Sequence, residues 1–596
     1  MVLQSNFFLF LLGVQLMSAY RTDFDPYTVT SSGKIVGTSS FSRRGRLFSV
    51  FRGIPYAKPP VGSLRFKEPE EIEKWNHTFF ATKDAPKCAQ KNYLFGIHNI
   101  EGSEDCLYLN VYTPNLDFKK KPIPVMVFIH WGGFFAGYSG SEYLGPEYFM
   151  DKDVVLVTFN YRLGVLGFFS TYDDSAPGNF GFKDQTLALK WVQKNIKNFG
   201  GDNTKVTIFG QSAGGASVHY HMISKNSEGL FQRAISESGT ALALWAQPFD
   251  GKTVQLPQIQ AKLVGCGHSV NNSSSMVDCL RQVDVESLIQ SGDRFKFFSV
   301  DPLTVYLPAI EKKTANNPNP FITKHPIEYI KFGNFSRVPW IVGIVSDEGL
   351  LRASALWSQS YVWKNLNKKF DILMPKMMML SNSAPNHKIP PLWEKIKSFY
   401  FKESDDENPA KYKTMRGLID LYTDRAFHYS TYQSTLLHSV QGHNPIWFYK
   451  FNYRGQYTYK TLFSGVNETT SSYPHSASHC DDLLYLFKSK ALFADLNKEN
   501  DQEMIDHMIN LWTDFATYGN PTPRDSLKWK PITNLKEIGK QEITKSINFL
   551  HIKGSFNNES PSFQMDTGIY NNRLHFWEEL PLIENIKELD QNHQDF

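Results

Sequence analysis

Residues 206–218 read VTIFGQSAGGASV, and this stretch decides the fold that the sequence predicts. Its apolar first half predicts a strand, and the small residues after Ser212 are compatible with a helix. The Gly-x-Ser-x-Gly motif between them is typical of a sharp strand-to-helix turn. Gly210 and Gly214 flank the serine because side chains there would collide with the neighbouring strand and helix. We therefore predict an exposed nucleophile, Ser212, near a helix N-terminus; the alternative is an ordinary serine in a glycine-rich turn.

Other segments predict the sheet to which this turn belongs. Apolar runs at 125–129, 153–158 and 340–345 are bounded by glycine or polar residues, which is typical of strands buried on both faces. Residues 184–196 have apolar side chains at helical spacing. Strands that alternate with helices predict a mostly parallel α/β sheet. In such a sheet, ligands bind beyond the carboxyl ends of the strands.

Composition excludes several classes of protein. The 596 residues are 41% hydrophobic, 14% aromatic and 20% charged, which is unlike a disordered, collagen-like or coiled-coil chain. The formal net charge is only +4, and no basic–aromatic stripe is present, so we expect no nucleic-acid partner. Outside the first residues, no apolar stretch is long enough to span a membrane.

The ends of the chain and its cysteines predict secretion. Residues 1–19 read as a signal peptide, with an apolar run over 7–16, which leaves 20–596 as one domain. The five cysteines include two close pairs, expected to form disulfides in an oxidising compartment, and one left over, Cys480. The expected pairs are Cys88 with Cys106 and Cys266 with Cys279. The Asn-x-Ser/Thr acceptor sites for glycosylation are Asn76, Asn271, Asn272, Asn334, Asn467 and Asn558.

Several ordered motifs resemble one family along nearly all of the mature chain. They are FRGIPYAKPPVGSLRF (51–66), SEDCLYLNVY (103–112), NYRLG (160–164), GNFGFKDQ (178–185) and WTDFATYGNP (512–521). They resemble the type-B carboxylesterases, which include the cholinesterases and insect esterases. The resemblance implies the α/β-hydrolase fold, a mostly parallel sheet flanked by helices with large inserted loops and helices, and a serine ester hydrolase that needs no metal or organic cofactor.

The resemblance also assigns the base and the acid that a serine nucleophile needs. The segment SHCDDLLYLF (478–487) resembles the segment that carries the family's catalytic histidine, so His479 is the expected base. The segment VSDEG (345–349) resembles the segment whose glutamate completes the triad, so Glu348 is the expected acid. Its neighbour Asp347 is the alternative, because adjacent carboxylates cannot be separated without geometry.

An oxyanion hole is expected at HWGGF (130–134), where the family has His-Gly-Gly-Gly. The resemblance implies that the N–H groups of Gly132, Gly133 and Ala213 hold the oxyanion. Trp131 replaces the family's first glycine. If its indole folds away, the hole survives beside an aromatic pocket wall; if it points inward, acyl groups are restricted or activity falls. We favour the first outcome. His130 is expected to be a structural residue at a strand end, and not a second base.

The substrate pocket is expected to be aromatic, with Trp131, Phe134, Phe135 and Trp245 at positions where the family lines its gorge, although core packing explains each residue equally well. Residues 89–105 contain no tryptophan, which disfavours choline esters. Gln211 gives Gly-Gln-Ser-Ala-Gly, which resembles the insect juvenile hormone esterases, whose substrate is an apolar terpenoid methyl ester.

The leading hypothesis is therefore a secreted carboxylesterase that acts on small apolar esters, with a juvenile hormone esterase as the specific alternative. Two rival hypotheses are a non-catalytic binding or adhesion protein on the same fold, and a carrier of apolar ligands whose oxyanion hole is blocked by Trp131. The sequence does not predict the oligomeric state.

Overall fold

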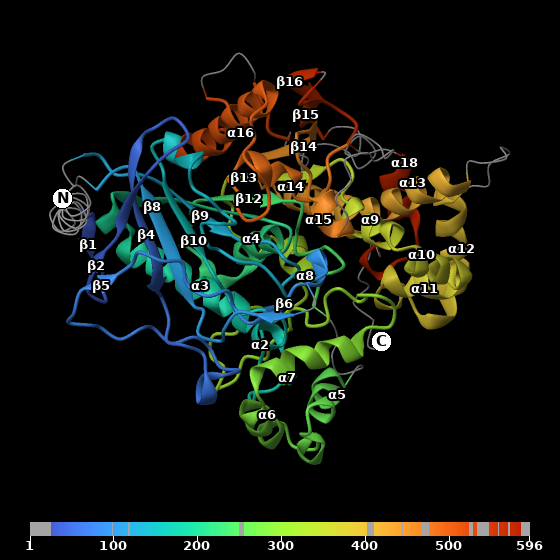
Figure 1. The fold of residues 1–596 in the computed structure, drawn as a ribbon. Coiled ribbons are helices and arrows are strands. Elements are labelled where there is room, and N and C mark those ends of the chain that lie inside the picture. The colour runs from blue at the N-terminus through green and yellow to red at the C-terminus, as the bar shows by residue number, and fades with distance from the viewer. Residues whose placement is uncertain are drawn as a thin grey trace, which may run out of the picture.

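One long sheet organises the molecule (Figure 1). The structure, a computed structural model, describes residues 25–97, 99–116, 120–248, 255–401, 410–443, 445–465, 476–523, 528–532, 547–557, 559–569 and 572–585. The predicted signal peptide, residues 1–19, lies outside this part of the chain.

The described strands are β1 (Tyr27–Val29), β2 (Lys34–Val36), β3 (Thr38–Phe41), β4 (Leu47–Pro55), β5 (Phe79–Phe80), β6 (Gln90–Lys91), β7 (Ile100–Glu101), β8 (Tyr108–Thr113), β9 (Ile123–Ile129), β10 (Val155–Phe159), β11 (Gly201–Gln211), β12 (Arg233–Glu237), β13 (Trp340–Val345), β14 (Ile446–Arg454), β15 (Phe549–Ser555) and β16 (Glu559–Asp566). The described α-helices are α2 (Gly164–Phe168), α3 (Phe180–Asn195), α4 (Ala213–Ile223), α5 (Leu256–Leu263), α6 (Ser273–Gln282), α7 (Val285–Gln290), α8 (Pro326–Lys331), α9 (Leu350–Ser358), α10 (Ser360–Lys368), α11 (Phe370–Met377), α12 (Ile389–Tyr400), α13 (Ala410–Thr423), α14 (Tyr429–Val440), α15 (Lys460–Ser464), α16 (Glu499–Tyr518) and α18 (Asn572–Glu579).

The main sheet has 11 strands in the order β16-β15-β14-β13-β12-β11-β9-β10-β8-β4-β3. Its centre, from β15 to β10, is parallel, and antiparallel strands complete both edges. The four runs that the sequence predicted as strands become β9, β10, β11 and β13, and the predicted helix over 184–196 lies within α3 and the turn that follows it. The predicted fold class is therefore confirmed.

Alternation along the central strands creates a hydrophobic core on each face of the sheet. On β9, Val125, Val127 and Ile129 belong to the core that contains α3 and α4. Met126 and Phe128 point to the opposite core, into which α16 packs. Because both faces are covered, the central parallel strands β9, β10 and β13 are almost entirely apolar, as is typical of buried parallel strands.

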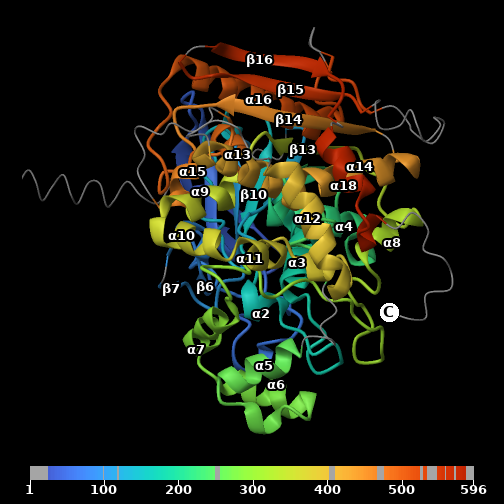
Figure 2. The same ribbon diagram turned by 90° about the vertical axis from the view of Figure 1, so that its right-hand side faces the viewer.

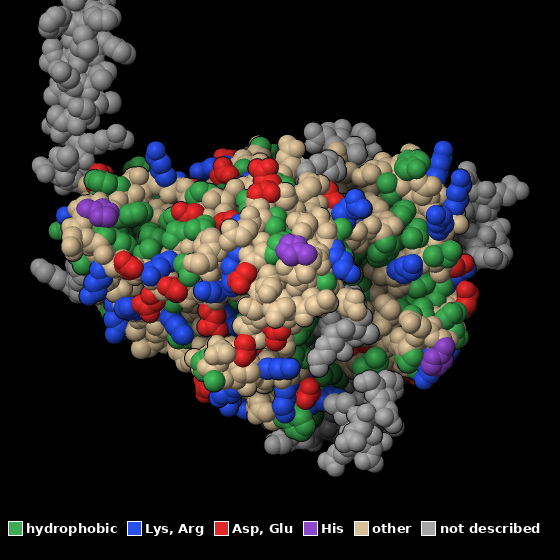
Figure 3. Space-filling view, turned by 90° about the horizontal axis from the view of Figure 1, so that it is seen from below, with side chains coloured by type: hydrophobic (Ala, Val, Ile, Leu, Met, Phe, Trp, Pro, Cys, Tyr) green, Lys and Arg blue, Asp and Glu red, His purple; other side chains and the backbone are tan. Residues whose placement is uncertain are grey.

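Two long insertions build on this frame. Helices α5–α8 lie between β12 and β13 in the sequence, and α9–α14 lie between β13 and β14. Figure 1 shows α5–α7 below the sheet and α9–α13 beside it, and Figure 2 shows the second group from the front. On the face that carries the first group, basic and acidic side chains are interspersed (Figure 3).

Both predicted disulfides are present, Cys88–Cys106 and Cys266–Cys279. Four of the predicted glycosylation acceptors, Asn76, Asn271, Asn272 and Asn334, are exposed, whereas Asn467 and Asn558 lie outside the described residues. In the described part of the chain, no helix is both long enough and apolar enough to cross a membrane.

Candidate active site

Ser212 occupies the turn between β11 and α4. Its φ of 57° and ψ of −120° are unusual for a residue with a side chain, because positive φ brings Cβ into steric conflict with the backbone. Two backbone hydrogen bonds hold it there: its N–H donates to Glu237 O at 2.8 Å, and its carbonyl accepts from Ala216 N at 2.9 Å. The strained serine is thus held between the sheet and the first turn of the helix, as the motif predicted.

The flanking glycines allow this close approach. A Cβ on Gly214 would overlap the carbonyl oxygen of Ile129 at the end of β9, and one on Gly210 would lie 2.6 Å from the backbone of Gly214. Strand and helix can therefore meet at this point only because both positions lack a side chain.

Glu348 and His479 reach the same place from different segments. Glu348 follows β13 and is fully buried; its Oε1 accepts from Val345 N at 2.9 Å, and its Oε2 lies 2.5 Å from His479 Nδ1. The loop that carries the histidine is joined to the loop that carries the acid, because Asp347 N donates to Ala477 O at 3.0 Å and Asp347 pairs with Ser478 in a parallel bridge. This backbone contact brings together residues 131 positions apart.

The second carboxylate, Asp347, faces away from the imidazole. Both its oxygens accept hydrogen bonds of 2.8 Å from Arg416, and Oδ2 also accepts from Ser476. Of the two adjacent acids that the sequence could not separate, the structure therefore places Glu348 on His479 and Asp347 in an ion pair.

The hydrogen bonds of His479 identify its tautomer. The short contact with Glu348 places the proton on Nδ1, which leaves Nε2 as an acceptor. The amide Nε2 of Gln211 lies 3.3 Å from that nitrogen and donates to it. The other end of the Gln211 amide is held as well, because Cys480 Sγ–H donates to Oε1 at 3.2 Å. Burial raises the pKa of the Cys480 thiol, so it remains a neutral donor.

The lone pair on His479 Nε2 thus lies beside Gln211, the last residue of β11 and the residue before Ser212. In this conformation its recorded hydrogen bond is with Gln211, and none joins it to Ser212. Such contacts are often loose before substrate binds and tighten in the complex. Ser212, Glu348 and Gly133 line one cavity, so the nucleophile and the acid of the predicted triad open onto the same space.

The loop after β9 supplies the predicted oxyanion donors. Gly132 and Gly133 have positive φ values of 118° and 58°, and within the described residues their N–H groups have no recorded hydrogen bond. Phe135 N and Ala136 N both donate to Gly132 O, at 3.0 and 2.9 Å, which fixes the turn. Ala213 is the first residue of α4, so its N–H has no partner within the helix. These three N–H groups have no recorded partner in the described residues, so they remain the candidate oxyanion donors that the sequence predicted.

Substituting Gly132→Ala should lower kcat about 10²- to 10³-fold with a smaller change in KM, because the new Cβ would overlap Ala136 O and displace the donor loop. The steady-state rate constants on one ester measure this effect. Gly45→Ala is the matched control: it also has positive φ, of 81°, but a Cβ there meets nothing within 4 Å. A normal kcat in Gly132→Ala would contradict the assignment of the loop.

Trp131 takes the first of the two orientations considered from the sequence. Its indole is 3% exposed and packs against Phe95, Tyr459 and Tyr143, with ring centroids at 5.3, 6.2 and 6.5 Å. It belongs to the core on the α16 side of the sheet and does not line the cavity. The indole is drawn into this aromatic cluster because burial of so large an apolar surface is favourable.

Phe134 also lies outside the pocket wall. It is fully buried against Phe168 and Phe182, with ring centroids at 5.1 and 5.6 Å. Trp131 and Phe134 are thus core residues, which corrects their placement in the pocket. His130 is buried and its ring stacks on that of Tyr161. Its Nδ1 contacts Trp131 O at 2.8 Å, and burial lowers the pKa of His130 to about 4. It is neutral at physiological pH and structural, as expected.

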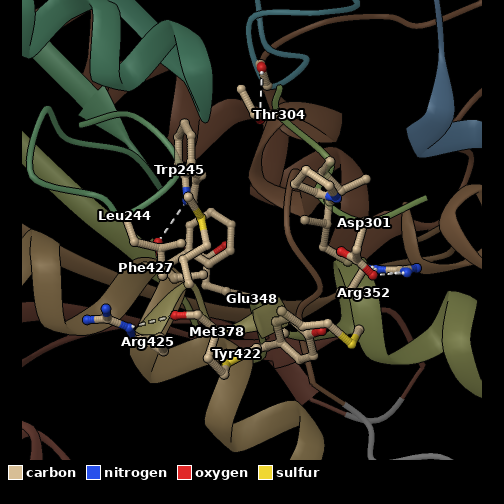
Figure 4. Close-up of a pocket in the computed structure, with 18 of the residues that line it drawn as sticks. Leu244, Trp245, Asp301, Thr304, Glu348, Arg352, Met378, Tyr422, Arg425 and Phe427 are labelled. Carbon is tan, nitrogen blue, oxygen red and sulfur yellow. Dashed lines mark hydrogen bonds and ion pairs between the residues drawn. The ribbon is translucent and has the colours of Figure 1, made fainter. Parts of the chain in front are cut away.

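The pocket contains about 880 Å³ of empty space, part of which is open to solvent. Phe135 and Trp245 line it, as the sequence predicted. Most of the other lining residues were not predicted from the sequence (Figure 4). They come from 301–304, 376–379 and 422–427, within or beside the two insertions, and no local motif marks them. No cluster of residues suited to holding a metal ion is found in the described chain.

Comparisons with known proteins agree with this geometry. Residues 25–577 match the model of the carboxylesterase family. A juvenile hormone esterase of Tribolium castaneum is 48% identical over 570 residues, which are 95% of this chain and 96% of that protein. Venom carboxylesterase-6 of Apis mellifera is 36% identical over 94% of this chain and 95% of its own. The crystal structure of juvenile hormone esterase from Manduca sexta, with OTFP covalently attached, is 28% identical, with a TM-score of 0.79, and covers 94% of this chain and 99% of that one.

Proposed function

Because the chain belongs to the carboxylesterase family and is a carboxylic ester hydrolase, we propose that it works through a covalent acyl-enzyme formed on Ser212 and that it acts on apolar esters outside the cell. The observation that carries this proposal is the 2.5 Å contact between Glu348 and Nδ1 of the buried His479. The other ring nitrogen, Nε2, lies at the end of β11, where it contacts Gln211, the residue before Ser212. Glu348 and Ser212 both line the same, mostly apolar pocket.

The reaction proceeds in two halves. Ser212 Oγ attacks the ester carbonyl while His479 Nε2 takes its proton, and Glu348 stabilises the imidazolium. The N–H groups of Gly132, Gly133 and Ala213 hold the negative oxygen of the tetrahedral intermediate. His479 then gives the proton to the leaving alcohol, and the acyl group remains on Ser212. A water molecule, deprotonated by His479, then attacks the acyl carbon. The bond to Ser212 Oγ breaks, His479 returns the proton to that oxygen, and the acid is released.

Three features support an extracellular site of action. The two disulfides are stable in an oxidising compartment. Four asparagines in glycosylation motifs are exposed. The first 19 residues have the apolar run of a signal peptide. Isolation of the protein from the medium of secreting cells, with a mass above that of the polypeptide, would test this part.

Juvenile hormone esterase activity is the specific candidate. The 48% identity over 95% of the chain to the Tribolium castaneum protein of that name favours it, and Gln211 at the centre of the serine motif agrees with it. The hypothesis of a blocked carrier loses its basis, because the Trp131 indole lies in the core.

Hydrolysis kinetics on a panel of esters test the proposal. The panel contains short-chain naphthyl esters, long-chain alkyl esters and terpenoid methyl esters. We expect turnover of the apolar esters, with the highest kcat/KM for terpenoid methyl esters if the specific candidate is right. A purified, folded protein that binds these esters without turnover would instead support the non-catalytic alternative.

A further inference from the structure

Between α13 and α14 the chain makes one π-helical turn, Asp424–His428, which we call the π-turn. Single π-helical turns within α-helices are rare and occur frequently at functional sites. Here the carbonyl oxygen of Ala426 accepts a hydrogen bond from the indole of Trp245 at 2.8 Å. Phe427 and Glu348 both line the pocket (Figure 4). The π-turn therefore lies against the active site.

The π-turn and the residue before it hold the loop that carries the triad acid. His428 Nε2 lies 2.8 Å from Val345 O, the carbonyl oxygen at the end of β13. Thr423 Oγ1, immediately before the π-turn, accepts from Gly349 N at 2.9 Å. Glu348 lies between these two anchors, and its Oε1 accepts from Val345 N at 2.9 Å. One short segment thus fixes the acid loop at its start and at its end.

The hydrogen bond to Val345 defines the state of His428. A carbonyl oxygen can only accept, so the imidazole proton is on Nε2 and His428 is the donor. The residue is 5% exposed, and burial, followed by the positive charge of Lys450, lowers the pKa of His428 well below its usual value. It is therefore neutral at physiological pH. His428 is not among the described residues that line the pocket, so a substitution there removes no contact with a bound ester.

The residue before His428 contacts the base of the triad. The ring centroid of Phe427 lies 4.6 Å from that of His479, with 42° between the ring planes. Asp424, at the other end of the π-turn, accepts from Arg573 at 2.9 Å, which ties the turn to α18. Because Phe427 and His428 are consecutive, a displaced π-turn would disturb the contacts of the acid loop and of the base together.

We propose that His428 is a positioning residue of the triad: its hydrogen bond to Val345 O holds the start of the acid loop, so that Glu348 keeps its contact with the base. His428 touches neither the ester nor the reacting atoms. Without the donor, the buried carbonyl of Val345 would be left unpaired, which is unfavourable, and the loop would shift. A displacement of about 1 Å in a catalytic group can lower the rate about 10²-fold. This inference rests on the proposed function, in which Glu348 stabilises the imidazolium.

Three substitutions of His428 test the inference. In His428→Met, which removes the donor, we expect kcat to fall about ten- to hundredfold with KM within about twofold, because alignment of the triad and not substrate binding is lost. His428→Gln places an amide N–H near the position of Nε2 and should keep kcat within about threefold of the wild type. His428→Asn places the same amide near the position of Nδ1, too far from Val345, and should lose as much as His428→Met.

Steady-state kinetics on one ester measure these effects, and thermal unfolding checks that each variant is folded. If His428→Met does not fold, the ratio of kcat between His428→Gln and His428→Asn decides, since these two differ only in the reach of one amide.

His443→Met is the matched control, at the other end of β13. His443 is also buried, and its Nε2 lies 2.6 Å from Val338 O, two residues before the strand begins. Its loss likewise leaves a buried carbonyl without its donor, so it should destabilise the fold. It should nevertheless leave kcat within about twofold of the wild type, because this carbonyl does not lead into the acid loop.

A normal kcat in His428→Met, an equal loss in His428→Gln, or an equal loss in His443→Met would overturn the inference. The proposed function would stand in each case, provided that Glu348→Gln loses its activity. A Glu348→Gln variant with normal kcat would overturn the proposed function and this inference with it.

Discussion

Substituting Ser212→Ala should lower kcat for ester hydrolysis by about 10⁵-fold or more, to the background of the assay, because no other group at the apex of the turn can form the acyl-enzyme. The fold should persist, since the substitution removes one oxygen, and the backbone hydrogen bonds to Glu237 and Ala216 that hold the turn remain. The kcat from initial rates, with circular dichroism as the check on folding, measures this effect.

Ser217→Ala is the control for that experiment. Ser217 lies one turn further along α4, is fully buried, and donates to Ala213 O at 2.8 Å. It does not line the pocket, so its loss should leave most of the activity in place. Equal losses of kcat in the two variants would mean that the substitutions act by disturbing α4, and not by removing the Ser212 hydroxyl.

Substituting Glu348→Gln should lower kcat by about 10³- to 10⁴-fold, because the amide neither fixes the productive tautomer of His479 nor stabilises the imidazolium. The matched variant is Asp347→Asn, in the adjacent residue. Asp347 bonds Arg416 and lies apart from the imidazole, so its loss should lower kcat by less than about tenfold. The measurement is the ratio of the two kcat values. A larger loss of kcat in Asp347→Asn than in Glu348→Gln would mean that Asp347, and not Glu348, is the acid of the triad.

The fold could be predicted because its signals are local. Residues 125–129, 153–158, 206–209 and 340–345 are short apolar runs in which both faces must be buried, and these runs form the centre of the sheet. The signal for the turn that carries Ser212 is equally local. Its glycines at 210 and 214 are required by contacts with residues nearby in sequence and with the neighbouring strand. The antiparallel edges were not predicted, because their strands are short or only half apolar.

The pairing inside the site could not be predicted from residue types alone. Glu348 and Asp347 are adjacent acids, and what separates them is Arg416 on α13, more than 60 residues away in sequence, which takes Asp347. The orientation of Trp131 depends in the same way on Phe95 and Tyr459, which come from other segments. Such choices are made by tertiary packing, for which the local sequence carries no signal.

The pocket was the hardest part to predict, for a related reason. Met377, Tyr422 and Phe427 belong to an insertion whose helices have no motif, and their approach to Ser212 depends on how α9–α13 dock beside the sheet. The family resemblance placed four aromatic residues in the lining. Phe135 and Trp245 do line the pocket, whereas Trp131 and Phe134 are core residues.

Identification of the residue labelled by a fluorophosphonate tests most directly whether Ser212 is the nucleophile. The purified protein is treated with diisopropyl fluorophosphate until esterase activity is lost, and the adduct is located by peptide mass spectrometry. We predict one adduct, on Ser212, formed in step with the loss of activity. An adduct on another residue, or complete inactivation with Ser212 unmodified, would contradict the assignment.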